Sequence, residues 1–208
     1  MTAGSGIIHQ EMPKESPTGM MWGFQFWANL PANQKMMPPR YRDVKAADIP
    51  EVKLESGVFI KIISGEVAGV RGPVRDIVID PELLDVSIPA GTTFTHSVKQ
   101  GHTAIAYILD GEGYFDDRRD AFAFEMAGAG WMDVTRRCIC GPETVVLYER
   151  DGQEVAIVAG DRPVRFLFLS GAPLNEPVAW YGPIVMNTQE ELRIALDEYA
   201  KGTFVKHS

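Results

Sequence analysis

The stretch PAGTTFTHSVKQGHTAIAYILDGEG, residues 89–113, decides the fold class because it sets an apolar run between two turn signals. Pro89-Ala90-Gly91 opens the stretch, and Asp110-Gly111 follows the apolar residues 104–109. A short run of apolar, β-branched and aromatic residues between such turn residues is typical of a β-strand. The stretch therefore predicts a strand at its centre.

Runs of the same kind fill most of the chain in both directions from this stretch. They are short, apolar or alternating, and separated by Gly, Pro and Asp: residues 7–8, 23–30, 58–63, 74–79, 83–88, 144–148, 154–158 and 164–169. Asp151-Gly152, between two of these runs, predicts a β-hairpin. Many short antiparallel strands at this spacing indicate an all-β sandwich or small barrel.

One helix is predicted at the end of the chain. Residues 188–191 (TQEE) form a capping box, and their carboxylates lie at the positive end of the helix dipole. Leu192, Leu196 and Tyr199 follow at helical spacing, and Gly202 is placed to end the helix. Because the apolar stripe needs a surface to cover, we expect this helix to pack on a barrel.

A linker is predicted over residues 35–50 (KMMPPRYRDVKAADIP). Its prolines at positions 38, 39 and 50 prevent continuous ladder pairing. The sequence therefore predicts a boundary here between a short N-terminal unit and a larger β unit.

The charge of the chain argues against nucleic acid as a partner. The 208 residues carry a formal net charge of −8, and their basic clusters are the short pairs Arg118-Arg119 and Arg136-Arg137. Phosphate binding needs clustered Lys and Arg. We therefore expect no direct contact with nucleic acid.

No export signal or membrane span is visible, and the two cysteines favour a reducing compartment. The N-terminus lacks a basic region followed by an apolar stretch, and no run reaches about 18 apolar residues. A disulfide between Cys138 and Cys140 would close a strained ring. As a metal pair they lack a second Cys/His pair nearby. We expect thiols on one strand face and a cytoplasmic protein.

The candidate functional residues are His9 and Glu11. If residues 7–11 form a strand, both side chains project from the same face. An imidazole and a carboxylate on one face suit Fe(II), which leaves positions open for substrate and O₂. Since such pairs also occur on exposed strands by chance, the residues alone leave metal ligation and a plain surface strand both open.

His96 and His102 are weaker candidates. They flank the glycine-containing residues 95–101, but no His-x-His pair is present and no Glu follows at a suitable interval. We therefore favour hydrogen bonding or packing in a degenerate barrel over half of a metal-ligand set.

Several motifs, in order, resemble the pirin family. TAGSGIIHQEMP is similar to the family signature G-x-G-I-x-H-x-E-M-P, and GFQFWANLP to the block G-x-Q-L-W-V-N-L-P. KMMPPRYRDV resembles a third block of the family. Of two longer stretches, residues 89–113 resemble the core of the family's second domain and residues 169–199 resemble its ending. The matching stretches are residues 2–13, 23–31, 35–44, 89–113 and 169–199. The resemblance thus covers the chain almost from end to end.

The resemblance implies an all-β bicupin fold with a metal, usually iron, in the first of two barrels. It implies that residues 1–50 are a remnant of the N-terminal metal-binding domain and residues 51–172 the C-terminal cupin domain. Residues 173–208 would be a tail whose helix packs back on the N-terminal part. The family binds its metal through a His-x-His pair and the His and Glu of H-x-E-M. Only the second pair has counterparts, His9 and Glu11, so we expect an incomplete first barrel and weakly held or absent Fe2+.

The resemblance also implies a function. Some pirins are quercetin 2,3-dioxygenases, and Glu11 would serve as metal ligand and as the base that removes the proton of a flavonol hydroxyl. Because half of the ligand set has no counterpart, we expect little activity from residues 1–208. The alternative is a non-catalytic, protein-binding pirin that acts as an iron-sensing transcription cofactor, or a folded fragment without a function of its own. We expect a monomer in either case.

Overall fold

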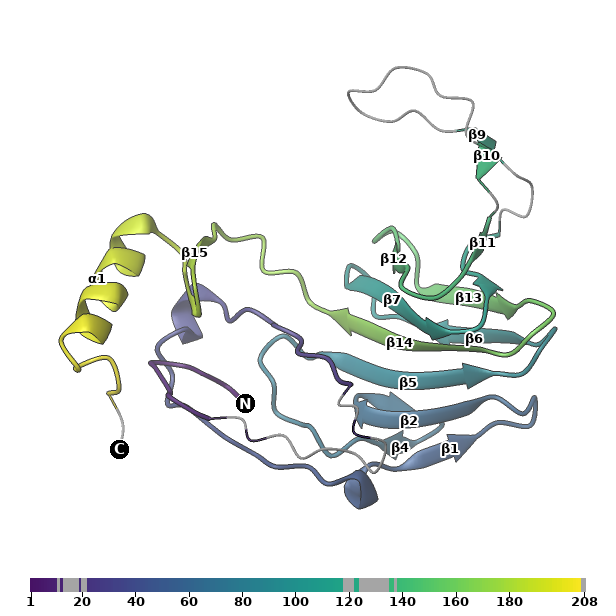
Figure 1. Cartoon of the computed structure of the whole chain (residues 1–208), viewed down its shortest axis with the longest axis horizontal. Helices are drawn as coiled ribbons and strands as arrows, with labels where there is room; N and C mark the ends of the chain where they lie inside the picture. Colours follow the sequence, from purple (N-terminus) through teal and green to yellow (C-terminus); the bar gives the residue numbers. More distant parts are fainter. Residues whose placement is uncertain are drawn as a thin grey trace. The chain divides into compact units, whose positions relative to one another are not determined.

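The chain folds into two compact units in a computed structural model (Figure 1). One unit joins residues 1–43 with residues 174–208, and the other spans residues 44–173. The structure describes residues 1–10, 12, 19, 22–117, 122–123, 135–136 and 138–206.

Two antiparallel sheets build the larger unit. The six-stranded sheet has the order β1-β2-β5-β14-β7-β12, and the four-stranded sheet has the order β11-β8-β13-β6. The six strands are β1 (Glu51–Lys53), β2 (Phe59–Ser64), β5 (Glu82–Ile88), β14 (Val164–Gly171), β7 (Thr103–Asp110) and β12 (Val145–Leu147). The four are β11 (Ile139–Cys140), β8 (Gly113–Tyr114), β13 (Glu154–Ala159) and β6 (Thr93–Ser97). Two short pairs complete the unit: β3 (Glu66–Val67) with β4 (Val70–Arg71), and β9 (Phe122–Ala123) with β10 (Thr135–Arg136).

Strand β14 organises the core because it pairs along both of its edges. Its register with β5 runs from Val164↔Ile88 to Ser170↔Glu82, and on its other edge it pairs with β7. Phe166 and Phe168 are fully buried. Alternate residues of β5 and β7 are buried as well, as expected for strands with one face toward a core. The apolar alternation that predicted these strands therefore describes their inward face.

The smaller unit contains the predicted helix. The hairpin β15 (Ala179–Tyr181) and β16 (Ile184–Met186) packs with α1 (Gln189–Ala200) around four buried residues: Ala179, Ile184, Leu192 and Ala195. The capping box of Thr188 and Glu191 is confirmed. Gly202 has a φ of +72°, and its N–H donates to the carbonyl of Tyr199, so it ends the helix as predicted.

A polar network ties the N-terminal segment of the smaller unit to its C-terminal segment. The ammonium of the buried Lys35 donates to Asn29 Oδ1 at 2.7 Å. Glu176 Oε2 accepts from the backbone N–H of Ala32 at 2.7 Å and from the Asn187 side chain at 3.0 Å. Burial lowers the pKa of Lys35, while Glu176 and Glu191 oppose that shift. The remaining short helices are η1 (Ala32–Gln34) and η2 (Ala46–Asp48).

The fold class is confirmed: the described residues are all-β apart from one C-terminal α-helix and two short 3-10 helices. Within the described residues, no helix has the length and apolar character needed to cross a membrane.

The predicted hairpin at Asp151-Gly152 is wrong. Strand β12 pairs with β7, whereas β13 pairs with β6 and β8, so the turn joins strands of different sheets. A turn signal specifies a local chain reversal, but the ladder partner is chosen by the packing of the whole sheet.

Three predicted strands are also absent from the described residues. Residues 7–8 and 23–30 carry no strand assignment, and Trp22, Phe24, Phe26 and Trp27 are exposed. Residues 75–79 form a loop, since Asp76 and Asp80 have φ values of +60° and +48° that interrupt an extended chain. Apolar content alone does not supply a ladder partner.

Two glycines allow a matched test of the barrel's turns. Gly111 and Gly91 have φ values of +75° and +64°, so alanine at either position costs about 1–2 kcal/mol. At Gly111, an added Cβ would also lie 1.8 Å from the carbonyl oxygen of Pro163, whereas at Gly91 nothing lies within 4 Å. We predict that Gly111→Ala lowers the free energy of unfolding by roughly 4 kcal/mol or more, and Gly91→Ala by the conformational cost alone. Urea denaturation measures both, and equal losses would refute the close approach.

Tyr148 offers a test of the core against pH. Its hydroxyl is buried and has no hydrogen-bond partner among the described residues. Burial raises the pKa of Tyr148, and Cys140 and Asp116 contribute in the same direction. Above a pH of about 10, the phenol therefore ionises in the unfolded chain but not in the folded one, so stability falls as the pH rises.

We predict that Tyr148→Phe leaves the free energy of unfolding unchanged at pH 7 or raises it by about 1 kcal/mol, since it removes an unsatisfied buried group. The variant also loses less stability than the parent chain between neutral and strongly alkaline pH. Denaturant unfolding at a series of pH values measures this, with the exposed Tyr41→Phe as the control. A clear loss of stability at pH 7 would show that the hydroxyl has a partner.

Candidate functional site

The two residues proposed as metal ligands lie in the smaller unit. His9 is exposed, while Glu11 lies outside the described residues, so the prediction that their side chains share a face stays a prediction. In the parts of the chain that the structure describes, no group of three or more His, Cys, Asp or Glu residues could hold a metal ion. The described residues therefore do not by themselves supply a full set of iron ligands.

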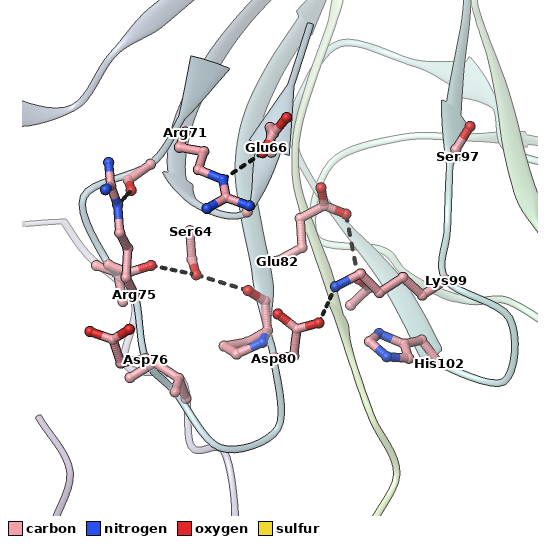
Figure 2. A pocket seen from close by; sticks show the side chains of 16 residues that line it. Ser64, Glu66, Arg71, Arg75, Asp76, Asp80, Glu82, Ser97, Lys99 and His102 are labelled. Atoms are coloured by element: carbon pink, nitrogen blue, oxygen red, sulfur yellow. Dashed lines mark hydrogen bonds and ion pairs between the residues drawn. The ribbon is translucent and has the colours of Figure 1, made fainter. Parts of the chain in front are cut away.

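A polar cleft of about 610 Å³ opens on the larger unit (Figure 2). Its base includes Ser64, Glu82 and Ser170, which are largely buried, and its rim carries Arg71, Asp80 and Lys99. Figure 2 shows the labelled side chains of this lining around a common space, with carboxylates and cationic groups interleaved. The cleft was not predicted from the sequence.

The base of the cleft is a polar end of the apolar core. Glu82 begins β5 on the same face as the buried Leu84, and Ser170 lies directly opposite it on β14. The side chains of His96 and Glu82 are only 10% and 15% exposed. His96 reaches Glu82 from β6, in the other sheet, so the two sheets meet at this pair.

The hydrogen bonds at the base join His96 and Ser170 to Glu82. Its Nε2 lies 2.9 Å from Glu82 Oε2, and Ser170 Oγ donates to the same oxygen at 3.4 Å. The imidazole and the Ser170 hydroxyl thus converge on one carboxylate oxygen. The imidazole also stacks on Phe94 and meets the edge of Phe168, with ring centroids 5.9 Å and 5.3 Å apart. The prediction that His96 serves hydrogen bonding and packing is confirmed.

His102 lies beside the cleft without such partners. It lines the wall, and its Nδ1 is buried with no hydrogen-bond partner in the described structure. The predicted hydrogen-bonding role is therefore not seen at this nitrogen.

The rim is held by exposed ion pairs and by one buried hydroxyl. Arg71 Nε lies 2.5 Å from Glu66 Oε2, and Lys99 pairs with Asp80. The hydrogen bond to Glu66 raises the pKa of Arg71, so its charge is constant. Ser64 Oγ lies 3.0 Å from the carbonyl oxygen of Val74 and 2.8 Å from that of Pro81, which holds the ends of the loop that borders the cleft.

The sequence did contain a signal for the base of the cleft. In residues 82–88 the core-facing positions are Glu82, Leu84, Val86 and Ile88, so the alternation puts a carboxylate on the buried face. A buried carboxylate needs a donor, and the nearby strand offers His96. The pattern could not name that donor, because the two residues lie on different sheets.

The two cysteines lie at and just before β11. Cys138 and Cys140 are half-buried and are present as thiols, as predicted, and Cys140 Sγ lies 3.7 Å from the carbonyl oxygen of Cys138.

Comparisons with known proteins agree on a family. Residues 83–205 match the pirin C-terminal cupin domain. A pirin-like protein of Caulobacter vibrioides is 36% identical over 98% of this chain and 66% of its own length, and Pirin-1 of Arabidopsis thaliana is 35% identical over 96% and 62%. A Thermoplasma acidophilum protein with the provisional name quercetin 2,3-dioxygenase is 34% identical over 100% and 78%.

A solved structure gives the same result. The crystal structure of a quercetin 2,3-dioxygenase from Acinetobacter baumannii is 31% identical, with a TM-score of 0.71 over 86% of this chain and 55% of that one. The chain therefore spans between about half and four fifths of the length of these relatives.

Proposed function

Because the chain belongs to the pirin family of cupin proteins, we propose that it takes part in a metal-dependent dioxygenase reaction of the quercetin 2,3-dioxygenase type. The observation that carries the proposal is the similarity to the Acinetobacter baumannii enzyme over most of this chain, at 31% identity and a TM-score of 0.71. The substrate class that follows is a flavonol-like small molecule.

His9 and Glu11 are the residues that we assign to Fe2+. Imidazole and carboxylate are the donors that non-haem iron takes when it keeps open positions for substrate and O₂. Bound iron would supply the site at which the substrate hydroxyl and O₂ meet. Glu11 would also accept the hydroxyl proton. Two ligands hold iron only weakly, so we propose that further ligands come from outside the described residues.

The exposed aromatic residues of the N-terminal segment support the proposal that this segment belongs to a metal-binding barrel. Trp22 and Phe24 have ring centroids 5.1 Å apart, and Phe24 and Phe26 have centroids 6.0 Å apart. Trp27 lies 6.2 Å from Trp180 of the C-terminal segment of the same unit. Aromatic residues in an extended segment are typical of a strand with a covered face. We propose that residues 1–50 belong to the family's metal-binding barrel, residues 51–172 form the C-terminal cupin domain, and residues 173–208 complete the first part.

The same exposed aromatic residues favour one alternative function. A cluster of exposed rings, rather than a closed cavity, is what a protein-binding surface presents. A non-catalytic pirin that binds another protein through the smaller unit is therefore the second candidate.

Iron retention tests the proposed metal site. We predict that purified residues 1–208 lose most of their iron on dialysis against a chelator and turn over quercetin slowly, because two protein ligands hold iron weakly. A version extended by the in-frame codons upstream of Met1, where these encode an H-P-H-x-G-F-E-like stretch, should retain iron and gain activity. Metal analysis and oxygen consumption measure the two effects.

His9→Ala should abolish iron retention in the extended version, whereas the control His102→Ala should not. Near-stoichiometric iron in residues 1–208 after chelation would contradict the incomplete ligand set. An iron-loaded but inactive extended version would favour the protein-binding alternative.

A further inference from the structure

The cleft of the larger unit has the chemistry of a binding site for a small zwitterion. We propose that it takes a ligand with an ammonium group and a carboxylate, an amino acid or a short peptide, with the ammonium on Glu82 and Asp80 and the carboxylate on Arg71 and Lys99. Every one of these residues belongs to residues 44–173. His9 belongs to the other unit, and the proposal does not depend on the proposed dioxygenase function.

The base of the cleft presents an acceptor that the protein itself does not use. Glu82 Oε2 accepts from His96 and Ser170, while in the described part of the larger unit no hydrogen bond reaches Oε1. A Cβ built on Gly65 would lie 3.1 Å from Oε1, so the glycine leaves that oxygen uncovered. An ionised carboxylate in a largely buried position calls for a donor, and a ligand ammonium provides one.

The position of Glu82 has a cost that packing alone does not explain. It stands on the core-facing side of β5, where an apolar residue would extend the core that Leu84 and Phe168 belong to. A buried His–carboxylate pair is often less stabilising than apolar residues of similar volume. A polar pair at a position that favours apolar residues is typical of a functional site, and here we infer a binding site.

The rim supplies two cationic side chains whose ion-pair partners a ligand can replace. Arg71 and Lys99 pair with Glu66 and Asp80 at side-chain exposures between 46% and 68%. Exposed ion pairs contribute little to stability, so a ligand carboxylate can replace these partners at little cost. Figure 2 shows the Arg71 guanidinium, the Lys99 ammonium and the carboxylates of Glu82 and Asp80 turned toward the same space.

The mixed charge of the wall selects a zwitterion over other classes. Three cationic side chains stand beside four carboxylates, so the lining presents both signs of charge, which a ligand that carries both complements: Arg71, Arg75 and Lys99, and Glu66, Asp76, Asp80 and Glu82. Most of the lining is charged, Ser or Gly, which disfavours a flat apolar molecule such as a flavonol. A volume of about 610 Å³ is ample for a dipeptide.

Binding of L-seryl-L-serine to the full chain tests the proposal. Titration followed by the histidine ring resonances should shift the signals of His96, which is bonded to Glu82, and of His102, which lines the cleft. Free L-serine distinguishes an amino acid from a peptide as the source of the zwitterion. The N-acetyl form of the dipeptide lacks the ammonium group, and the methyl ester form lacks the carboxylate. Each should bind more weakly than the dipeptide itself, by about tenfold or more.

Variants identify the two ends of the site. Glu82→Gln keeps the size of the side chain but removes its charge, and should weaken binding by about tenfold. Lys99→Ala removes an exposed ammonium from the rim and should weaken binding several-fold. The control is Lys53→Ala, which changes an exposed lysine of β1 outside the cleft and should have no effect. Circular dichroism checks that Glu82→Gln is folded.

The proposal is overturned if millimolar dipeptide and serine leave the His96 and His102 signals unchanged. Equal binding of the acetylated and esterified forms, or equal effects of Lys99→Ala and Lys53→Ala, would overturn it too. None of these outcomes depends on iron, so they leave the test of His9 and Glu11 intact.

Discussion

The pairing of β14 with β5 on one edge and β7 on the other is the constraint on which the larger unit depends. Ser170 and Glu82 face each other although 88 positions separate them. Phe166 and Phe168, on the same strand as Ser170, are buried in the core. Such long-range pairing must close long loops before it is stabilised by burial. Once it forms, the inward faces of three strands are aligned together.

That alignment explains why the polar groups of this unit gather at one end. The aromatic residues Phe94, Phe115, Phe166 and Phe168 fill the interior, and Phe115 meets Phe166 edge to face at 5.2 Å. The row of core-facing residues begins at Glu82 on β5 and finishes at Ser170 on β14, so these two residues lie at the same end of the core. The apolar core of the larger unit therefore gives way to polar side chains at Glu82 and Ser170.

The smaller unit rests on a different device, the carboxylate of Glu176, which joins two segments that are distant in the sequence. Lys35 binds Asn29, and Glu176 joins Ala32 to Asn187, so residues on both sides of the larger unit's sequence share one network. Removing one partner would leave another polar group buried without its hydrogen bond. The proposed iron ligands His9 and Glu11 belong to the same unit as this network and the exposed aromatic residues.

The sequence by itself determined the local elements. The alternation in residues 83–88, 104–109 and 164–169 predicted three strands, and the capping box with Gly202 predicted α1, because period, caps and turns act over a few residues. Only the tertiary structure decided which strands pair, and so placed Asp151-Gly152 between sheets and residues 75–79 in a loop. It also brought His96 to Glu82. A partner on another sheet is selected by the packing of the whole core, and no short pattern records that choice.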